Sequence, residues 1–329
     1  MSTQQCDPQD AELMMNPIYV ISQVVHVLFS TLTIIIIVLM GRGFMKVRVH
    51  KNVKRIIISI YFCIFIHAVV FIAFEVQHIW SMIAKHSTCA TYHTGVTCAC
   101  VRITIHFFSL SLAMLQVGLC IDRTFATICS EKHEKLGIQI TTAYCIVVIF
   151  GALIASIVID YTSVDETFIS CLNNSKVNRA RVDLTNYALT AANCVTIIWL
   201  IAIYERNKFY SRKLDIGLSN RYQVQENISS TRLTIVIGCT QLLFFTAHLA
   251  LNMSRRAVFT TMSTVLYRIL ESVGYLLTYY SFILPLVMYV YIKRDMHNKI
   301  TSLQNTINRN SSRGVEGTNL YFSMYGKHW

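Results

Sequence analysis

Residues 217–253 read GLSNRYQVQENISSTRLTIVIGCTQLLFFTAHLALNM, and the two halves of this stretch differ sharply in polarity. The first half is polar and charged, whereas the second half, from Thr234 to Met253, is almost wholly apolar. A helix needs about 20 mostly apolar residues to cross a bilayer core about 30 Å thick. The apolar half therefore predicts a membrane-spanning helix, and the polar half predicts a segment outside the membrane that leads into it.

Apolar runs of this kind recur along the chain of 329 residues. The chain is 54% hydrophobic and 14% charged, whereas soluble domains are about 25% charged. Backbone amides in hydrocarbon must bond within their own segment, so the runs should be helices, and no period-two alternation indicates a β-barrel. We therefore expect an all-α membrane protein, a seven-transmembrane helix bundle with spans at about 18–40, 56–80, 103–121, 141–160, 185–204, 233–252 and 269–292.

The Lys and Arg residues are distributed unevenly between the two sides of this bundle. Segments 41–55, 122–140, 205–232 and 293–329 hold 21 of the 29, and the segments on the other side hold 8. Short segments rich in Lys and Arg stay in the cytoplasm, so the amino terminus over 1–17 should be extracellular. The inner side has 21 basic and 8 acidic residues, a net charge of +13. This charge favours anionic membrane lipid and a cytoplasmic partner, with no nucleic acid.

The first apolar run does not resemble a signal peptide. It follows a segment with Asp7, Asp10 and Glu12 and no basic residue, whereas a signal peptide begins with positive charge and has an apolar core of about 7–15 residues. We expect this run to remain in the membrane as the first span.

The tail over 293–329 is expected to be cytoplasmic and to begin with a short amphipathic helix. Its apolar residues recur at spacings of 4, 3 and 4, and Lys293 and Arg294 supply a basic flank. Such a pattern favours a helix that lies on the inner membrane surface, and the alternative is a frayed polar tail. The apolar residues are Met296, Ile300, Leu303 and Ile307.

The third predicted span lies between a Cys and an Asp–Arg pair. Cys98 stands 25 residues before Arg123, which corresponds in a helix to about 37 Å, from one rim of the bundle to the other. Together with Asp122, this arrangement resembles the third helix of rhodopsin-like receptors. In those receptors the Cys is joined to the loop between the fourth and fifth helices, which implies a Cys98–Cys171 disulfide here. The competing pair is Cys100–Cys171.

Other interpretations of these residues stay open. Asp122 and Arg123 are also explained as the border charge that any inner helix end carries. The spacing Cys89-x3-His93-x4-Cys98-x-Cys100 suits a metal site, although disulfides are favoured over zinc thiolates outside the cell. The second span has no Asp, the fourth has no Trp, and the fifth and sixth have no Pro, so the chain is not an ordinary rhodopsin-like receptor.

The polar half of the opening stretch resembles the third inner loop of the nematode serpentine chemoreceptors, class alpha (Sra) in particular. The shared core Leu-Ser-x-Arg-Tyr-Gln-x-x-Glu-Asn is matched by Leu218, Ser219, Arg221, Tyr222, Gln223, Glu226 and Asn227. The resemblance implies a G-protein-coupled chemosensory receptor in the plasma membrane of sensory neurons. Its partners would be an extracellular small molecule or peptide and a heterotrimeric G protein.

The same polar residues favour a helix that continues into the sixth span. Asn220, followed by Gln223 three residues later, suits a cap, and Val224 and Ile228 follow at helical spacing. A rigid extension would pass a tilt of the span to a partner beneath it, and the alternative is a solvated connecting loop. The residues expected to couple to a G protein are Asp122, Arg123, Leu218, Arg221, Tyr222, Gln223, Glu226 and Asn227.

Polar side chains within spans are costly and mark candidate functional positions. Seven of them lie in the outer halves of the spans and are expected to line a ligand cavity between helices. For each the alternative is structural, such as a His that bonds a carbonyl or a Glu that reaches the headgroups. The candidates are Glu75, His78, His106, Ser109, Asn193, His248 and Glu271.

A transporter or channel is the alternative function. Such proteins often have inverted repeats and helices broken by Gly or Pro, features that this chain with its 3 Pro does not show. No enzyme, cofactor or metal is expected, because paired carboxylates, phosphate loops and nucleophile elbows are absent from the sequence. The topology leaves Asn173 as the glycosylation site among four N-x-S sequons.

The uneven distribution of Lys and Arg predicts the topology directly. A tag at the amino terminus should bind antibody on intact cells, and a tag at the carboxyl terminus should bind it only after permeabilisation. The measurement is immunofluorescence with and without detergent. Staining of a carboxyl-terminal tag on intact cells would contradict this topology.

Overall fold

The computed structural model describes residues 8–46, 50–84, 95–160, 171–172, 178–213, 218–258 and 262–311, and every regular element in these ranges is a helix. Seven stretches are long and apolar enough to cross a membrane, as the hydropathy pattern predicts. The helices are α1 (Pro8–Met15), α2 (Pro17–Lys46), α3 (Lys51–Ala84), α4 (Gly95–Ile128), α5 (Ser130–Asp160), α6 (Arg179–Lys213), α7 (Leu218–Ala257), α8 (Thr264–Val273) and α9 (Leu276–Ser311).

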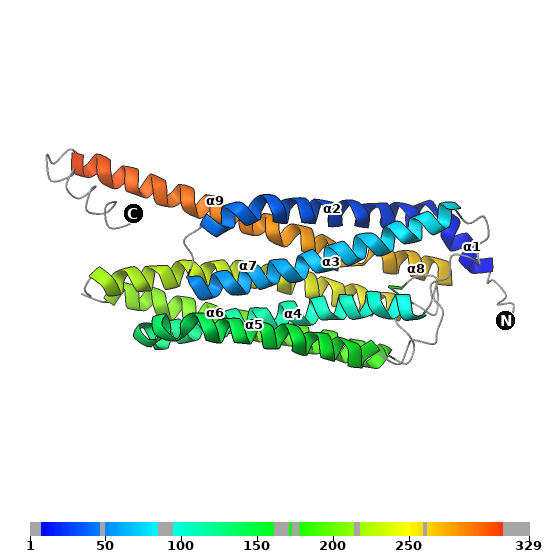
Figure 1. The fold of residues 1–329 in the computed structure, drawn as a ribbon, viewed down its shortest axis with the longest axis horizontal. Helices are drawn as coiled ribbons and strands as arrows, with labels where there is room; N and C mark the ends of the chain where they lie inside the picture. Colours follow the sequence, from blue (N-terminus) through cyan, green and yellow to red (C-terminus); the bar gives the residue numbers. More distant parts are fainter. Residues whose placement is uncertain are drawn as a thin grey trace. The chain divides into compact units, whose positions relative to one another are not determined.

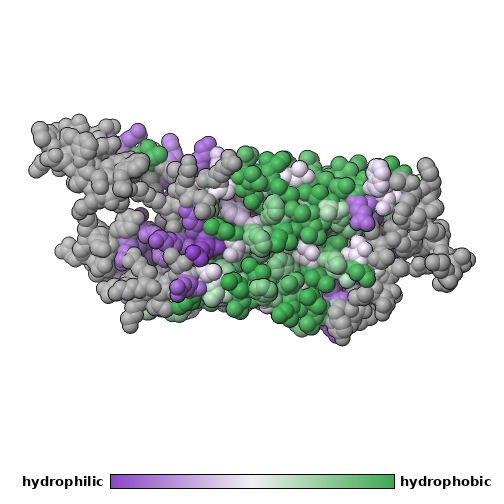
Figure 2. All heavy atoms as spheres, in the orientation of Figure 1, coloured by the Kyte–Doolittle hydropathy of each residue, from purple (hydrophilic) through white to green (hydrophobic). Residues whose placement is uncertain are grey.

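The chain divides into two units, Met1–Pro285 and Leu286–Trp329, and the first contains the bundle. Within it α2 to α7 run side by side (Figure 1). Apolar side chains such as Leu39, Val147 and Ile198 are exposed on the outside of these helices, as lipid-facing residues are. Figure 2 shows such residues gathered over the bundle.

α4 is the central helix, because it packs against α3, α5, α6 and α7. In its apolar stretch 67% of the residues are buried, against 17% to 50% in the other six candidate spans. A disulfide lies near its first turns and Arg123 near its last. We call the two ends of the bundle the disulfide end and the Arg123 end.

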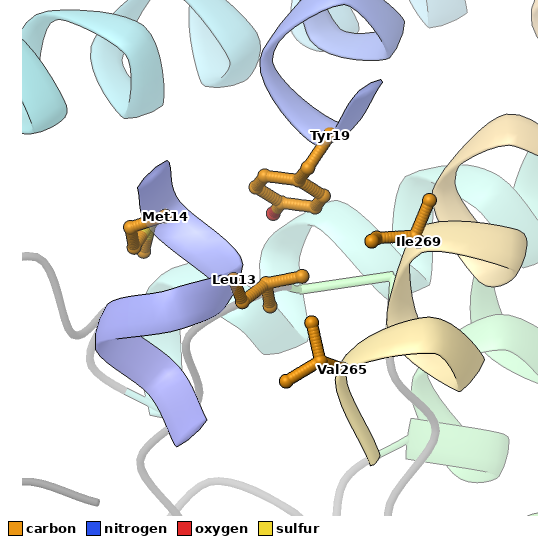
Figure 3. Packing of buried hydrophobic residues seen from close by; sticks show 5 residues of the cluster. All are labelled: Leu13, Met14, Tyr19, Val265 and Ile269. Atoms are coloured by element: carbon orange, nitrogen blue, oxygen red, sulfur yellow. The ribbon is translucent and has the colours of Figure 1, made fainter. Parts of the chain in front are cut away.

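A short helix packs across the disulfide end. In α1, Leu13 and Met14 are buried with Tyr19 of α2 and with Val265 and Ile269 of α8 (Figure 3). Asn16 then caps α2, since its side-chain Oδ1 accepts a hydrogen bond of 3.0 Å from the Ile18 N–H. The residue between them, Pro17, suits the first position of a helix, where its missing N–H costs nothing.

The seventh apolar run, expected as one helix over about 269–292, is divided into α8 and α9. Gly274 ends α8, and its N–H donates to the Leu270 carbonyl oxygen at 2.9 Å. A Cβ at this position would lie 2.7 Å from the same oxygen, so the break needs glycine. Hydropathy does not register such a break, because the residues on both sides are apolar.

Two expected helix boundaries differ in the structure. α7 begins at Leu218, so Asn220 lies inside its first turn and not at the N-cap position. The segment from Lys293 onward does not start a new helix, because α9 continues without a break to Ser311. The expected continuity of the polar stretch with the sixth span is confirmed, since α7 runs unbroken to Ala257.

The contact of α4 with α5 predicts a sharp difference between two glycines. A Cβ at Gly118 would lie 2.3 Å from the Tyr144 ring, whose hydroxyl is held by a 2.6 Å hydrogen bond to the Met114 carbonyl oxygen. Gly118→Ala should therefore destabilise the bundle by about 1–3 kcal/mol, the usual cost of overpacking. Gly151→Ala is the matched control, because no neighbouring side chain of the described residues lies within 4 Å of its added methyl group. Thermal unfolding of the purified protein measures both, and equal midpoints would contradict the packing.

Candidate functional site

A cavity of ≈ 60 Å³ lies between helices near the disulfide end. Its walls come from α4, α6, α7, α8 and the start of α9, together with one residue next to the disulfide. A mixture of charged, polar and apolar side chains faces it. The lining residues are Arg102, Ile105, His106, Ser109, Leu172, Val182, Asn186, His248, Asn252, Arg255, Glu271, Tyr275 and Leu277.

The disulfide joins Cys98 of α4 to Cys171, as the likeness to rhodopsin-like receptors implied. Both residues are fully buried, and they pack with Phe74 and Val101. The bond holds the next residue, Leu172, at the cavity wall. Cys100 is a free, exposed thiol, so the competing pair does not form.

The candidate metal site formed by Cys89, His93, Cys98 and Cys100 lacks one of its donors in the structure. A disulfide sulfur is not a thiolate, so Cys98 cannot serve as a zinc ligand in this structure. Cys89 and His93 lie outside the described residues.

One wall of the cavity is a buried ionic cluster. The Arg102 Nε lies 3.5 Å from one carboxylate oxygen of Asp160, and the His106 Nε2 lies 3.4 Å from the other. Arg102 is 1% exposed and Asp160 is 0% exposed. A buried guanidinium requires such a partner, because removing a charge from water costs several kcal/mol. The cluster therefore ties the end of α5 to α4.

Another wall is formed by α7. His248, Asn252 and Arg255 follow one another at spacings of 4 and 3, which places them on one face of the helix. The Arg255 Nη2 donates to Asn252 Oδ1. Its Nε and Nη1 are buried and have no hydrogen-bond partner among the residues that the structure describes. The ring of His248 lies against the backbone of Gly274, where α8 ends.

Four of the seven predicted ligand-binding residues meet at this cavity. His106 and Ser109 come from α4, His248 from α7 and Glu271 from α8. They are far apart in the sequence, and the cavity brings them together as the position of each in its span indicated.

The other three predicted residues have structural partners elsewhere. Glu75 faces His26 of α2, with 3.7 Å between its Oε1 and the His26 Nδ1. His78 hydrogen-bonds the Tyr19 hydroxyl at 3.2 Å, and Asn193 accepts a 2.9 Å bond from Gln241 in the middle of the bundle. None of the three lines the cavity. The predicted glycosylation site Asn173 lies outside the described residues.

Several cavity residues were missed by the sequence reasoning. Arg102 and Arg255 were counted as charges of the loops, because each stands next to the expected end of a span. Their helical spacing to other cavity residues could have identified both arginines. Arg102 precedes His106 and Ser109 by 4 and 7, and Arg255 follows Asn252 and His248 by 3 and 7.

At the other end of α4 a second buried cluster surrounds Arg123. Its Nη2 donates to Asp122 Oδ2 at 2.5 Å, and Asp122 Oδ1 accepts from Asn52 of α3 at 3.1 Å. The Arg123 Nη1 donates to Asn227 Oδ1 of α7 at 3.4 Å. The Asn227 amide in turn donates to the Ala126 carbonyl oxygen at 3.0 Å.

This cluster changes the expected role of Arg123. The sequence predicted a residue of the inner surface, but Arg123 is 0% exposed. Its partner Asn227 belongs to the motif of the opening stretch, so two predicted coupling residues meet. Gln223 and Glu226 are half-buried, and the side chains of Leu218, Arg221 and Tyr222 lie outside the described part of the chain.

Comparisons with known proteins agree with this architecture. The model of the family described as serpentine type 7TM GPCR receptor class ab chemoreceptor matches residues 12–329. Serpentine receptor class beta-17 of Caenorhabditis elegans is 22% identical, over 95% of this chain and 88% of its own length. Serpentine receptor class alpha-10 of Caenorhabditis briggsae is 24% identical, over 59% of each chain. These matches do not single out class alpha.

The ionic cluster at the cavity predicts an unequal effect of two acid-to-amide changes. Asp160→Asn leaves the buried Arg102 without its carboxylate and should cost about 3–5 kcal/mol of stability. Asp183→Asn removes the acid of a partly exposed pair with Arg256 and should cost about 1 kcal/mol or less. Thermal unfolding of purified protein in lipid nanodiscs measures both. Similar losses would show that the cluster is not an ion pair.

Proposed function

The chain belongs to the class ab family of serpentine seven-transmembrane chemoreceptors, and we propose that it is a G-protein-coupled receptor for an extracellular ligand. The ligand binds in the cavity at the disulfide end, and the Arg123 end acts on a cytoplasmic heterotrimeric G protein. The amino terminus is extracellular, and the protein works in the plasma membrane of a sensory neuron. The contact between Arg123 and Asn227 is the observation that carries this proposal.

The positions of the disulfide and of the basic residues support this orientation. Disulfides persist in oxidising surroundings, which suits an extracellular position for Cys98–Cys171. Within Met1–Pro285, segments 41–55, 122–140 and 205–232 are rich in Lys and Arg and adjoin in sequence the helix ends nearest Arg123, as expected for a cytoplasmic side.

α7 is suited to carry a change from one end to the other. It is a single helix from Leu218 to Ala257, and Arg255 and Asn227 are 28 residues apart, about 42 Å along its axis. A ligand that favours a different tilt of α7 at the cavity changes the contact with Arg123. A ligand shifts such an equilibrium by as much as its affinities for the two states differ.

The Arg123 cluster is suited to be the contact that breaks. Asp122 stays beside Arg123 in any tilt, because the two are neighbours on α4. Asn227 is neutral and comes from another helix, so separating it from Arg123 breaks hydrogen bonds without separating two opposite charges. In the structure as described, Arg123 is buried, which we interpret as the inactive state.

This interpretation predicts that Asn227→Ala raises basal signalling. The change removes the bond to Arg123 and the bond to the Ala126 carbonyl oxygen. A loss of about 1 kcal/mol from the inactive state shifts the equilibrium between the inactive and active states about five-fold. Gln225→Ala is the matched control, since Gln225 is exposed on the same helix. The measurement is a second-messenger assay in transfected cells, normalised to surface protein.

A double variant separates release of Arg123 from general loosening of the bundle. Asn227→Ala combined with Arg123→Ala should return basal signalling to background, because the freed guanidinium is then absent. If Asn227→Ala matches the wild type, or if Gln225→Ala raises basal signalling equally, Arg123 and Asn227 do not restrain the receptor.

A further inference from the structure

The cavity contains a guanidinium whose hydrogen bonds are incomplete. Arginine has five N–H donors and remains charged in proteins. Asn252 accepts from Nη2 of Arg255, while the buried Nε and Nη1 find no acceptor within the described ranges. A buried donor left without a partner costs about 1–3 kcal/mol, and more for a charged group. An anion in the cavity would remove this cost.

The charges around the cavity also favour an anion. Arg102 and Arg255 line it, and the charge of Glu271 is influenced by Arg255 first and then by Arg268 and Arg179. Among the described residues Asp160 and Glu271 are the acids of this group, so four positive and two negative charges leave a net charge of +2 in this part of the chain. The pair formed by Asp183 and Arg256 adds no net charge.

The apolar lining residues and the volume of the cavity limit the kind of anion that fits. Ile105, Leu172, Val182 and Leu277 give the cavity an apolar wall, which suits a short hydrocarbon chain. Each water-sized group needs about 10–15 Å³ of such a cavity, so ≈ 60 Å³ accommodates about four to six of them.

From these observations we propose that the cavity binds a small organic carboxylate of about two to four carbons, held by Arg255. The carboxylate accepts charge-assisted hydrogen bonds from the buried Nε and Nη1, and its chain lies against the apolar wall. Arg102 faces the Asp160 carboxylate at 3.5 Å. Arg255 is near enough to Glu271 for the two charges to interact, but its buried Nε and Nη1 have no acceptor within the described ranges, so Arg255 is the residue that selects the anion. As an assignment of the receptor's ligand class, this rests on the proposed function, but binding itself is measured without signalling.

The test uses the purified full-length chain in lipid nanodiscs, with thermal unfolding followed during titrations. The probes are propanoate and butanoate, with propanamide and butanamide as neutral isosteres and sodium chloride and phosphate as simple anions. The two acids should raise the unfolding midpoint of the wild type, whereas the amides, chloride and phosphate should not. Amides that stabilise equally, acids that have no effect, or phosphate that matches butanoate would overturn the proposal.

Two neighbouring arginines provide the matched variants. Arg255→Gln should weaken butanoate binding about ten-fold or more, and Arg255→Lys, which keeps the charge with fewer donors, should weaken it less. Arg256→Gln should bind as the wild type does, because Arg256 pairs with Asp183 and does not line the cavity. Equal binding by Arg255→Gln and the wild type would overturn the proposal. If Arg255→Gln does not fold, the proposal is tested by the butanoate affinity of Arg255→Lys and by the comparison of acids with amides on the wild type.

A signalling assay on the same variants separates the two proposals. Butanoate that binds through Arg255 but evokes no second messenger would leave this site standing and contradict the receptor function. A response to a neutral odorant, with no binding of either acid, would overturn the carboxylate site and leave the receptor function intact.

Discussion

α4 buries a guanidinium near each of its ends, and neither can stay charged in a lipid-surrounded bundle without a partner. Arg102 and Arg123 are the bulkiest fully buried side chains in the described part of the molecule. They stand 21 residues apart, about 32 Å along the helix. The penalty for an unpaired buried charge is several kcal/mol, so each guanidinium needs a carboxylate, which α5 supplies for Arg102 and α4 itself supplies for Arg123. Asp160 comes from α5, Asn227 of α7 accepts from Arg123, and Asn52 of α3 donates to Asp122. This requirement explains why α4 is the centre of the packing.

The two arginines differ in what holds them. Arg102 faces a carboxylate from another helix, and the nearby disulfide fixes the same end of α4 covalently. Separating α5 from α4 would therefore strand two charges. Arg123 has its carboxylate on its own helix, and its link to α7 is a neutral amide. The disulfide end is thus the firmly held end, and the Arg123 end is the one where a helix can move at modest cost.

The fold was largely predictable, and the site only in part. Hydropathy located seven spans, and Cys98 and Arg123 placed the third correctly, because these signals depend on the sequence alone. Which way a polar side chain points depends on neighbouring helices, so Glu75 and Asn193 could not be told from His106 and His248. Arg102 and Arg255 looked like loop charges because span ends are uncertain by a few residues, although their helical spacing to the cavity histidines was visible. The break at Gly274 leaves hydropathy unchanged and needed the structure.

α7 has polar partners along its length, and its contacts at three positions indicate how it can move. Near one end Arg255 and His248 face the cavity. In the middle Gln241 donates to Asn193 of α6 and accepts from the Tyr280 hydroxyl at 3.3 Å. Near the other end Asn227 bonds Arg123. A translation of α7 along its axis would break the bonds of Gln241 and of Asn227 together, whereas a tilt about Gln241 keeps the bonds of Gln241 and moves the two ends. Tilting is therefore the less costly motion, and it is also the one that links the cavity to Arg123.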